Sequence, residues 1–177
     1  VVRQHFGFLR LYERKGGETD AFDLKLDATL LYGGLLLPFG AFALRHPDVF
    51  AACAPFSAGV WTDDEVIGMK QEMWDAVVGP VFGPGMKGKD RLTAHFRGYS
   101  PLELAKTLPE ASLKRVRYYI DCGDDDFLFK GNVALSVILH DRKIPHEFRV
   151  RDGGHTWVYW RTGLVDALAF IGESFRR

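Results

Sequence analysis

The stretch Phe148-Arg-Val-Arg-Asp-Gly-Gly-His-Thr-Trp-Val-Tyr-Trp160 decides the fold. Phe148 and Val150 alternate with arginines, which is the period-2 pattern of a β-strand with one buried face. The pattern ends at a pair of glycines, and His155 follows them directly. We therefore expect His155 to lie where a strand ends and a helix begins, at the edge where open α/β sheets handle ligands. The alternative interpretation is a loop histidine packed in an aromatic cluster.

A second loop of the same type lies upstream. Residues 116–122 form a β-rich run that ends in Gly123-Asp-Asp-Asp126. One helix-length segment separates the two runs, which predicts a β-α-β unit whose right-handed crossover brings both strand ends to one edge of the sheet. Asp126 and His155 can then meet. An acid followed by a histidine, each after a strand, is the later part of the Ser, Asp, His order of α/β hydrolases.

Composition and charge limit the class of protein. The chain has 177 residues, 47% of them hydrophobic, which predicts one soluble globular domain. Lys+Arg 23 and Asp+Glu 23 cancel, and no basic stripe alternates with aromatic residues, so nucleic acids and membranes are not predicted partners. No apolar run approaches the roughly 20 residues of a membrane span. Because the chain opens on Val1 rather than Met, we interpret it as a processed protein or a fragment of unknown compartment.

Strands and helices alternate along most of the chain. Residues 30–57 predict a strand, a glycine turn, a helix over 41–45 and a strand over 50–57 that is buried on both faces. The last helix carries an apolar face made of Leu164, Leu168, Ile171 and Phe175. This order predicts a three-layer α/β fold with a mostly parallel sheet.

The segment from about 61 to 99 interrupts this alternation. Thr62-Asp-Asp-Glu65 fits a capping box, which predicts a helix that ends near Val77. Loop residues follow as far as Tyr99, and Ser100-Pro-Leu-Glu103 fits a second capping box. Because the segment lies between two core strands, we expect it to form a cap over the carboxyl edge of the sheet.

The residues that commonly bind metals form no recognised pattern. Cys53 and Cys122 lie in apolar, strand-like runs, which is typical of buried packing. Asp124 and Asp125 are interpreted as turn residues, because consecutive acids do not match the alternating ligands of a calcium loop. Four other histidines, His46, His95, His140 and His146, show neither the spacing nor the cysteine partners of a zinc site. No metal and no cofactor are therefore predicted.

Sequence motifs occur in a fixed order from about Phe39 to the C-terminus. They are Gly40-Ala41 with Ala43-Leu-Arg-His-Pro-Asp-Val-Phe50, Ala54-Pro-Phe-Ser-Ala-Gly59, Ile120-Asp-Cys-Gly with Asp126-Phe-Leu128, and Gly153-Gly-His-Thr-Trp157 with Tyr159-Trp-Arg161. Together they resemble the putative-esterase family of α/β hydrolases, which includes feruloyl and acetyl-xylan esterases and S-formylglutathione hydrolases.

The resemblance implies an α/β hydrolase fold and a serine-type carboxylic ester hydrolase, with Asp126 as the triad acid and His155 as the base. Residues 61–99 would match the family's variable insertion over the active site. The resemblance further implies a small-molecule or carbohydrate ester as substrate, with acetyl or feruloyl groups removed, and a secreted or periplasmic bacterial enzyme. The candidates for substrate contact are Trp61, Trp157, Tyr159 and Trp160, although packing is an equally good interpretation of the last three. The oligomeric state is not indicated.

The expected nucleophile is missing. The family carries Gly-x-Ser-x-Gly at the place where this chain reads Gly34-Leu-Leu-Leu-Pro38, so Leu36 stands in the serine slot. Leucine cannot attack a carbonyl. No serine precedes Ser57, which is the nearest other candidate because Pro55-Phe-Ser-Ala-Gly59 half-matches the motif.

Three accounts of this departure stay open. The chain is a pseudo-enzyme, which would make it a non-catalytic esterase-like binding or interaction protein; or a residue such as Ser57 supplies the nucleophile; or residues 1–38 do not report the true sequence. We favour the third account, because the acid, the base and the aromatic residues downstream all remain in place.

Overall fold

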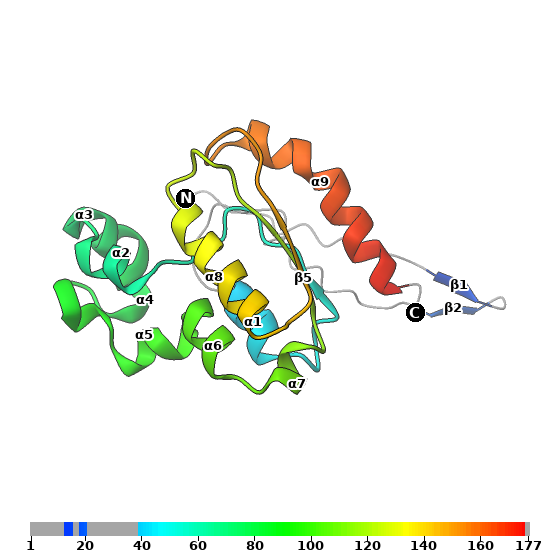
Figure 1. Ribbon diagram of the computed structural model, residues 1–177, viewed down its shortest axis with the longest axis horizontal. Coiled ribbons are helices and arrows are strands. Elements are labelled where there is room, and N and C mark those ends of the chain that lie inside the picture. Colours follow the sequence, from blue (N-terminus) through cyan, green and yellow to red (C-terminus); the bar gives the residue numbers. More distant parts are fainter. Residues whose placement is uncertain (1–12, 16–17, 21–38, 176–177) are drawn as a thin grey trace.

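The computed structural model describes residues 13–15, 18–20 and 39–175 (Figure 1). Strands β1 (Glu13–Lys15) and β2 (Glu18–Asp20) form an antiparallel pair. The main sheet has the order β3-β4-β5, and both strand pairs are parallel. Its strands are β3 (Ala52–Cys53), β4 (Arg117–Asp121) and β5 (His146–Arg149).

Helices surround this sheet and fill the segment between β3 and β4. In chain order they are α1 (Phe39–Arg45), α2 (Asp63–Gly68), α3 (Gln71–Met73), the π-helical turn η2 (Trp74–Val78), α4 (Gly79–Phe82), the 3-10 turn η3 (Gly88–Arg91), α5 (Ala94–Tyr99), α6 (Pro101–Thr107), α7 (Glu110–Leu113), α8 (Phe129–Asp141), α9 (Trp157–Gly172) and the 3-10 turn η4 (Glu173–Phe175). None of the helices in the described part of the chain combines the length and the apolar character needed to cross a membrane.

Strand β4 separates two layers of helices. Side chains alternate along a strand, so Tyr118 and Ile120 enter one core, which also holds Leu135 and Leu139 of α8. Tyr119 enters the other core, against α9. Figure 1 shows α9 on one side of the strands and α8 with α1 on the other. Each fully buried leucine contributes roughly 1.5–3 kcal/mol. The prediction of a three-layer α/β fold with a parallel sheet is confirmed.

Strand β3 is shorter than the predicted strand over 50–57. Proline has no N–H for the ladder, so regular pairing stops before Pro55. Contact with β4 continues at single points: the N–H of Asp121 donates to the Pro55 carbonyl over 3.1 Å, and the N–H of Ser57 donates to the Asp121 carbonyl over 2.7 Å. The chain therefore leaves the sheet at Ser57, beside the end of β4.

The prediction that Val150 lies on a buried face was wrong. Strand β5 ends at Arg149, and Val150 is exposed. Arg151 turns inward instead and forms an ion pair with the buried Asp121. If Asp121 were buried without a partner, the cost in free energy would be far greater than that of leaving Val150 exposed. The backbone therefore turns so that Arg151 reaches Asp121.

The buried face of α9 also differs from the predicted one. It consists of Tyr159, Trp160, Gly163, Ala167, Phe170 and Ile171. Leu168 is 44% exposed, and Phe175 lies in η4, beyond the helix. The small residues Gly163 and Ala167 allow α9 to approach the sheet closely. This property is missed when the buried face of a helix is predicted from its large apolar residues.

Residues 61–99 form helices with a core of their own, made of Val66, Trp74, Val78, Phe82 and Phe96. The first capping box is confirmed: the N–H of Thr62 donates to Glu65 over 2.8 Å, and the N–H of Glu65 donates to the Thr62 hydroxyl over 3.3 Å. At the second predicted capping box, helix α6 is present, but the side chain of Ser100 makes no capping hydrogen bond.

The continuous helix predicted up to Val77 and the loop predicted up to Tyr99 were both wrong. Helix α2 ends at Gly68, because the guanidinium of Arg91 donates to the carbonyls of Val66 and Met69 over 3.0 and 2.6 Å. The loop contains η3 and α5. In Figure 1 the helices α2 to α5 form a group beside α6. That this segment caps the carboxyl edge of the sheet stays a prediction.

Helix α8 begins in direct contact with the chain that follows Ser57. A Cβ atom on Gly131 would lie 1.8 Å from the carbonyl oxygen of Val60. We expect Gly131→Ala to lower the free energy of unfolding by about 1–3 kcal/mol, because backbone must move to admit a methyl group. Gly68→Ala is the control, since nothing lies within 4 Å of its added Cβ. Urea unfolding measures both; equal stabilities for the two variants would contradict this contact.

Candidate active site

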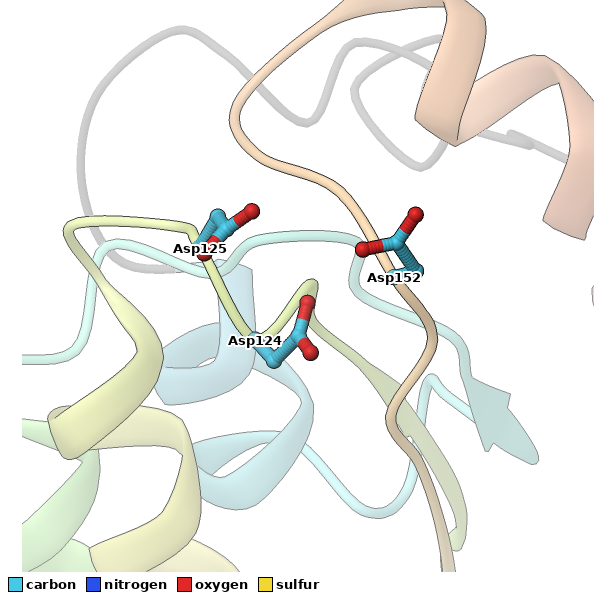
Figure 2. A group of neighbouring side chains, drawn as sticks. All are labelled: Asp124, Asp125 and Asp152. Atoms are coloured by element: carbon cyan, nitrogen blue, oxygen red, sulfur yellow. The ribbon is translucent and has the colours of Figure 1, made fainter.

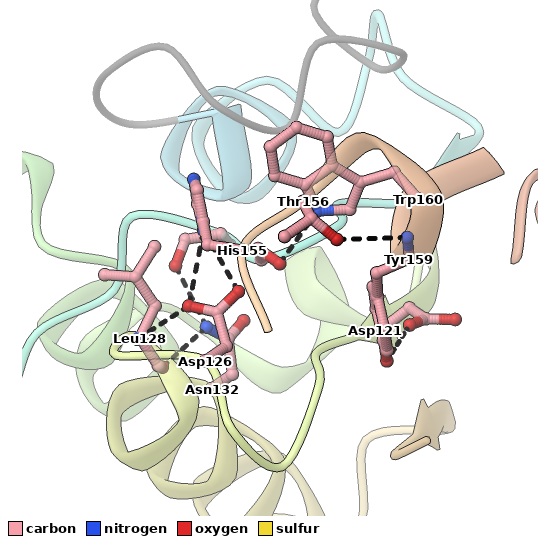
Figure 3. Close-up of polar contacts among 10 residues, drawn as sticks. Asp121, Asp126, Leu128, Asn132, His155, Thr156, Tyr159 and Trp160 are labelled. Carbon is pink, nitrogen blue, oxygen red and sulfur yellow. Dashed lines mark hydrogen bonds and ion pairs between the residues drawn. The ribbon is translucent and has the colours of Figure 1, made fainter. Parts of the chain in front are cut away.

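The loops after β4 and β5 run side by side. Beyond the strands, the N–H of Asp124 donates to the Arg151 carbonyl and the N–H of Asp125 donates to the Gly153 carbonyl, each over 3.2 Å. Gly153 has φ 131°, a backbone conformation that suits glycine. These contacts turn His155 toward Asp126, and Figure 3 shows the two side chains facing each other.

The structure brings Asp126 and His155 into hydrogen-bond contact. His155 Nδ1 lies 3.0 Å from Oδ2 and 3.3 Å from Oδ1 of Asp126. The Asp126 side chain has no exposed surface, whereas the imidazole is 22% exposed. Burial opposes ionisation of Asp126, but hydrogen bonds from His155 and from the N–H of Leu128 outweigh it. The pKa of Asp126 therefore lies below its ordinary value, and the acid is a carboxylate at neutral pH.

This charge state determines the tautomer of His155. A carboxylate only accepts hydrogen bonds, so the proton of the neutral imidazole lies on Nδ1. The lone pair is then on Nε2, as a general base requires. The pair can accept a proton at Nε2 and stabilise the resulting imidazolium beside a buried negative charge.

Aromatic rings flank the imidazole. The ring centroid of Phe127 lies 4.8 Å from that of His155, and Trp160 meets His155 edge-on at 4.8 Å. Trp157 contacts Trp160 at 5.3 Å. Phe127 and Trp157 are 60% and 50% exposed. Sequence reasoning did not select Phe127, although its place directly after Asp126 could have indicated it.

The other candidates for substrate contact lie deeper or in another core. Tyr159 is buried, and its hydroxyl donates to Asp121 over 2.6 Å. Trp160 is buried as well, and its indole N–H donates to Ser57 over 3.0 Å. Trp61 lines a small aromatic cavity with Phe82, Phe96 and Tyr99. Substrate contact by any of these residues stays a prediction.

The sequence offers two positions for a nucleophile, Leu36 and Ser57. Leu36 lies outside the described residues. Ser57 is 1% exposed, and its hydroxyl already accepts a hydrogen bond from the Trp160 indole. A buried hydroxyl of this kind is poorly placed to attack a substrate.

Both cysteines are buried, as expected from their apolar surroundings. Burial raises the pKa of the Cys53 thiol to about 12. Burial, together with the charges of Asp126 and Asp121, raises the pKa of the Cys122 thiol to about 12. Both residues therefore remain uncharged thiols at neutral pH.

Three exposed acids lie on the same pair of loops as Asp126 and His155. Figure 2 shows Asp124 and Asp125 on one loop and Asp152 on the other, and their carboxylate oxygens lie within 4.8 Å of one another. Asp124 accepts a hydrogen bond from the N–H of Gly153 over 3.1 Å. This contact joins the two loops, which fits the interpretation of Asp124 as a turn residue.

A buried ion pair holds the His155 loop to the sheet. The Asp121 side chain is fully buried, and both of its oxygens lie 2.9 Å from the guanidinium of Arg151. Burial and the hydrogen bond to Asp121 raise the pKa of Tyr159, so its phenol stays protonated and donates to the same carboxylate. Asp121 thus connects β4, the loop before His155 and the first turn of α9.

Comparisons with known proteins identify similar chains. The family model described as "Putative esterase" matches residues 41–171. A solved ferulic acid esterase is 26% identical, with a TM-score of 0.55 over 76% of this chain and 46% of that chain. No curated protein matches the chain significantly.

Two solved structures from Staphylococcus aureus are also similar. The fluorophosphonate-binding serine hydrolase F, with bound substrate, is 23% identical, with a TM-score of 0.56 over 75% of this chain and 49% of that chain. S-formylglutathione hydrolase is 21% identical, with a TM-score of 0.55 over the same shares. The chain thus spans about half the length of the solved structures that it resembles.

Asp121→Asn is expected to lower the free energy of unfolding by about 3 kcal/mol, because it leaves Arg151 without its charged partner. The matched control is Glu147→Gln, which breaks the ion pair of Glu147 with Arg149 on the surface. That change should cost less than about 1 kcal/mol, since water screens both groups. Chemical denaturation measures both variants. Similar losses would show that burial of Asp121 has no special importance.

Proposed function

The chain belongs to the putative esterase family and has the α/β hydrolase fold, and from this premise we propose that it hydrolyses a carboxylic ester. The observation that carries the proposal is the contact between His155 Nδ1 and the buried carboxylate of Asp126 at 3.0 Å. The two residues come from the ends of adjacent parallel strands, which the loop contacts hold together.

In this mechanism His155 is the general base and then the general acid. Nε2 takes the proton of an attacking hydroxyl as its oxygen bonds to the ester carbonyl, and the same proton passes to the leaving alcohol. Asp126 keeps the remaining proton on Nδ1 and stabilises the imidazolium between the two transfers. Water then repeats the sequence on the acyl intermediate, and the acid product leaves.

We place the nucleophile at position 36, immediately before α1. A nucleophile elbow lies between a strand and a helix, and α1 begins at Phe39, a few residues after Leu36. This assignment requires that residues 1–38 differ from the printed sequence. The burial of Ser57 supports it, because a buried hydroxyl is poorly placed to attack a substrate.

The proposed substrates are acetyl or feruloyl esters of carbohydrates. Support comes from the similarity to a ferulic acid esterase. Exposed aromatic rings at Phe127 and Trp157 add to it, because they offer flat apolar surface near the imidazole.

A second candidate function is that of a non-catalytic, esterase-like binding protein. The observation that favours it is Leu36 at the serine slot, with no serine before Ser57. The two proposals differ in a single measurable property, the presence of a reactive serine.

Peptide mapping of residues 1–40 is expected to find a serine at position 36, and that protein is expected to hydrolyse p-nitrophenyl acetate and to react covalently with a fluorophosphonate. Asp126→Asn should lower kcat by about 10³–10⁴-fold, because the imidazole loses the partner that orients it. Asp125→Asn is the control; this acid is exposed on the same turn, and kcat should not change. A folded chain with Leu36 verified, without activity or labelling, would refute the enzyme and support the binding protein.

A further inference from the structure

The indole of Trp160 packs against the imidazole of His155. The two ring planes meet at 88° and their centroids lie 4.8 Å apart, a T-shaped arrangement that aromatic pairs favour. Figure 3 shows the two side chains next to each other. Trp160 belongs to the first turn of α9 and is only 9% exposed. Most of the indole therefore meets protein, and one of its contacts is the proposed base.

The indole N–H of Trp160 is anchored beyond the end of β3. Trp160 Nε1 donates a hydrogen bond to Ser57 Oγ over 3.0 Å. Ser57 is 1% exposed, and its own N–H donates to the Asp121 carbonyl over 2.7 Å. The acceptor of the indole is thus itself fixed to β4. A buried side chain held by both packing and a hydrogen bond has one orientation, and its contact with His155 is equally defined.

The backbone of Ser57 supports a role for this anchor. Its φ is 46°, in the left-handed region that suits glycine. A glycine would adopt this conformation more easily, but it has no hydroxyl to accept the N–H of Trp160. Strain that the surroundings enforce in this way is typical of functional positions.

The imidazole needs more than Asp126 to have a defined orientation. The contact of Nδ1 with Asp126 at 3.0 Å fixes one atom of the ring, and the ring can still tilt about this bond. Phe127 and Trp160 both contact the imidazole and restrict the tilt. Phe127 is 60% exposed, whereas Trp160 is buried and anchored. Trp160 is therefore the more rigid of the two.

We propose that Trp160 is a positioning residue, whose ring fixes the tilt of the His155 imidazole while the Ser57 hydroxyl anchors that ring. Asp126 determines where Nδ1 lies, and Trp160 determines the plane in which Nε2 points toward the attacking hydroxyl. Ser57 acts only as the acceptor for the indole and does not attack the substrate. This inference rests on the proposed function and gives Trp160 a role toward the base in place of one toward the substrate.

Ser57→Gly tests the inference by removing the anchor. Glycine adopts a φ of 46° without strain, so this variant is expected to fold. The order parameter of the ¹³C-labelled His155 ring, measured by NMR relaxation, should fall from about 0.85 to below about 0.6, the values of rigid and flexible groups. The kcat for p-nitrophenyl acetate should fall by about 2–10-fold with KM unchanged, the effect of losing one aromatic contact.

Trp160→Phe provides a second variant, which keeps an aromatic ring beside His155 and removes the N–H. It should change the order parameter and kcat in the same direction as Ser57→Gly. The double variant should add little, because both changes break the same hydrogen bond.

The matched control is Trp74→Phe. Trp74 is also buried, and its indole N–H donates to the Gly83 carbonyl over 2.9 Å. It lies in the core of residues 61–99 and packs against Phe96. This variant should lose stability, as measured by urea unfolding, and change neither the order parameter of His155 nor kcat.

The results separate this inference from the proposed function. A more mobile His155 ring in both variants supports the positioning role even where the unmodified chain hydrolyses no ester, a result that would remove only the proposed function. An unchanged order parameter in the folded variants would overturn the positioning role, and so would an unchanged kcat in an active chain; both leave the esterase in place. Loss of fluorophosphonate labelling in Ser57→Gly alone would make Ser57 the nucleophile and overturn the inference as well.

Discussion

The arrangement of this molecule depends on one buried negative charge, that of Asp121. The residue ends β4, and its side chain has no exposed surface, so the charge must be compensated inside the protein. Arg151 supplies the opposite charge at 2.9 Å, and the Tyr159 hydroxyl donates to the same carboxylate. Each partner lies beyond the end of β5, on either side of His155. The compensation of Asp121 therefore also determines where the loop that carries His155 lies.

The dyad follows from this constraint together with the parallel sheet. Parallel neighbours place the ends of β4 and β5 at the same edge, and the hydrogen bonds of Asp124 and Asp125 extend the pairing into the loops. Asp126 is then within reach of His155, and the N–H of Leu128 also donates to its carboxylate over 2.9 Å. The acid and the base thus come from the ends of two adjacent strands. The site is thus a property of the edge of the sheet and not of any single loop.

Sequence reasoning could predict the meeting of Asp126 and His155, because topology alone brings such strand ends together. It could not predict that Arg151 turns inward, since alternation assigns it to the solvent face and the attracting charge of Asp121 lies 30 positions away in the sequence. Helix α2 ends early for a similar reason: Arg91, 25 positions from Val66, donates to its carbonyl. The face of α9 was misassigned because Gly163 and Ala167 contribute close approach rather than apolar area. In each of these cases a long-range contact overrides a local pattern.

The burial of Asp126 bears on the choice between an enzyme and a binding protein. An ionised carboxylate away from water is costly, and here hydrogen bonds from His155 and from the N–H of Leu128 offset the cost. For stability alone, an apolar residue at this position would serve as well or better. The arrangement is useful where a charge must act on a partly exposed imidazole, and His155 is such a group. The physical cost of keeping Asp126 ionised therefore favours a chemical role for the pair over a structural one.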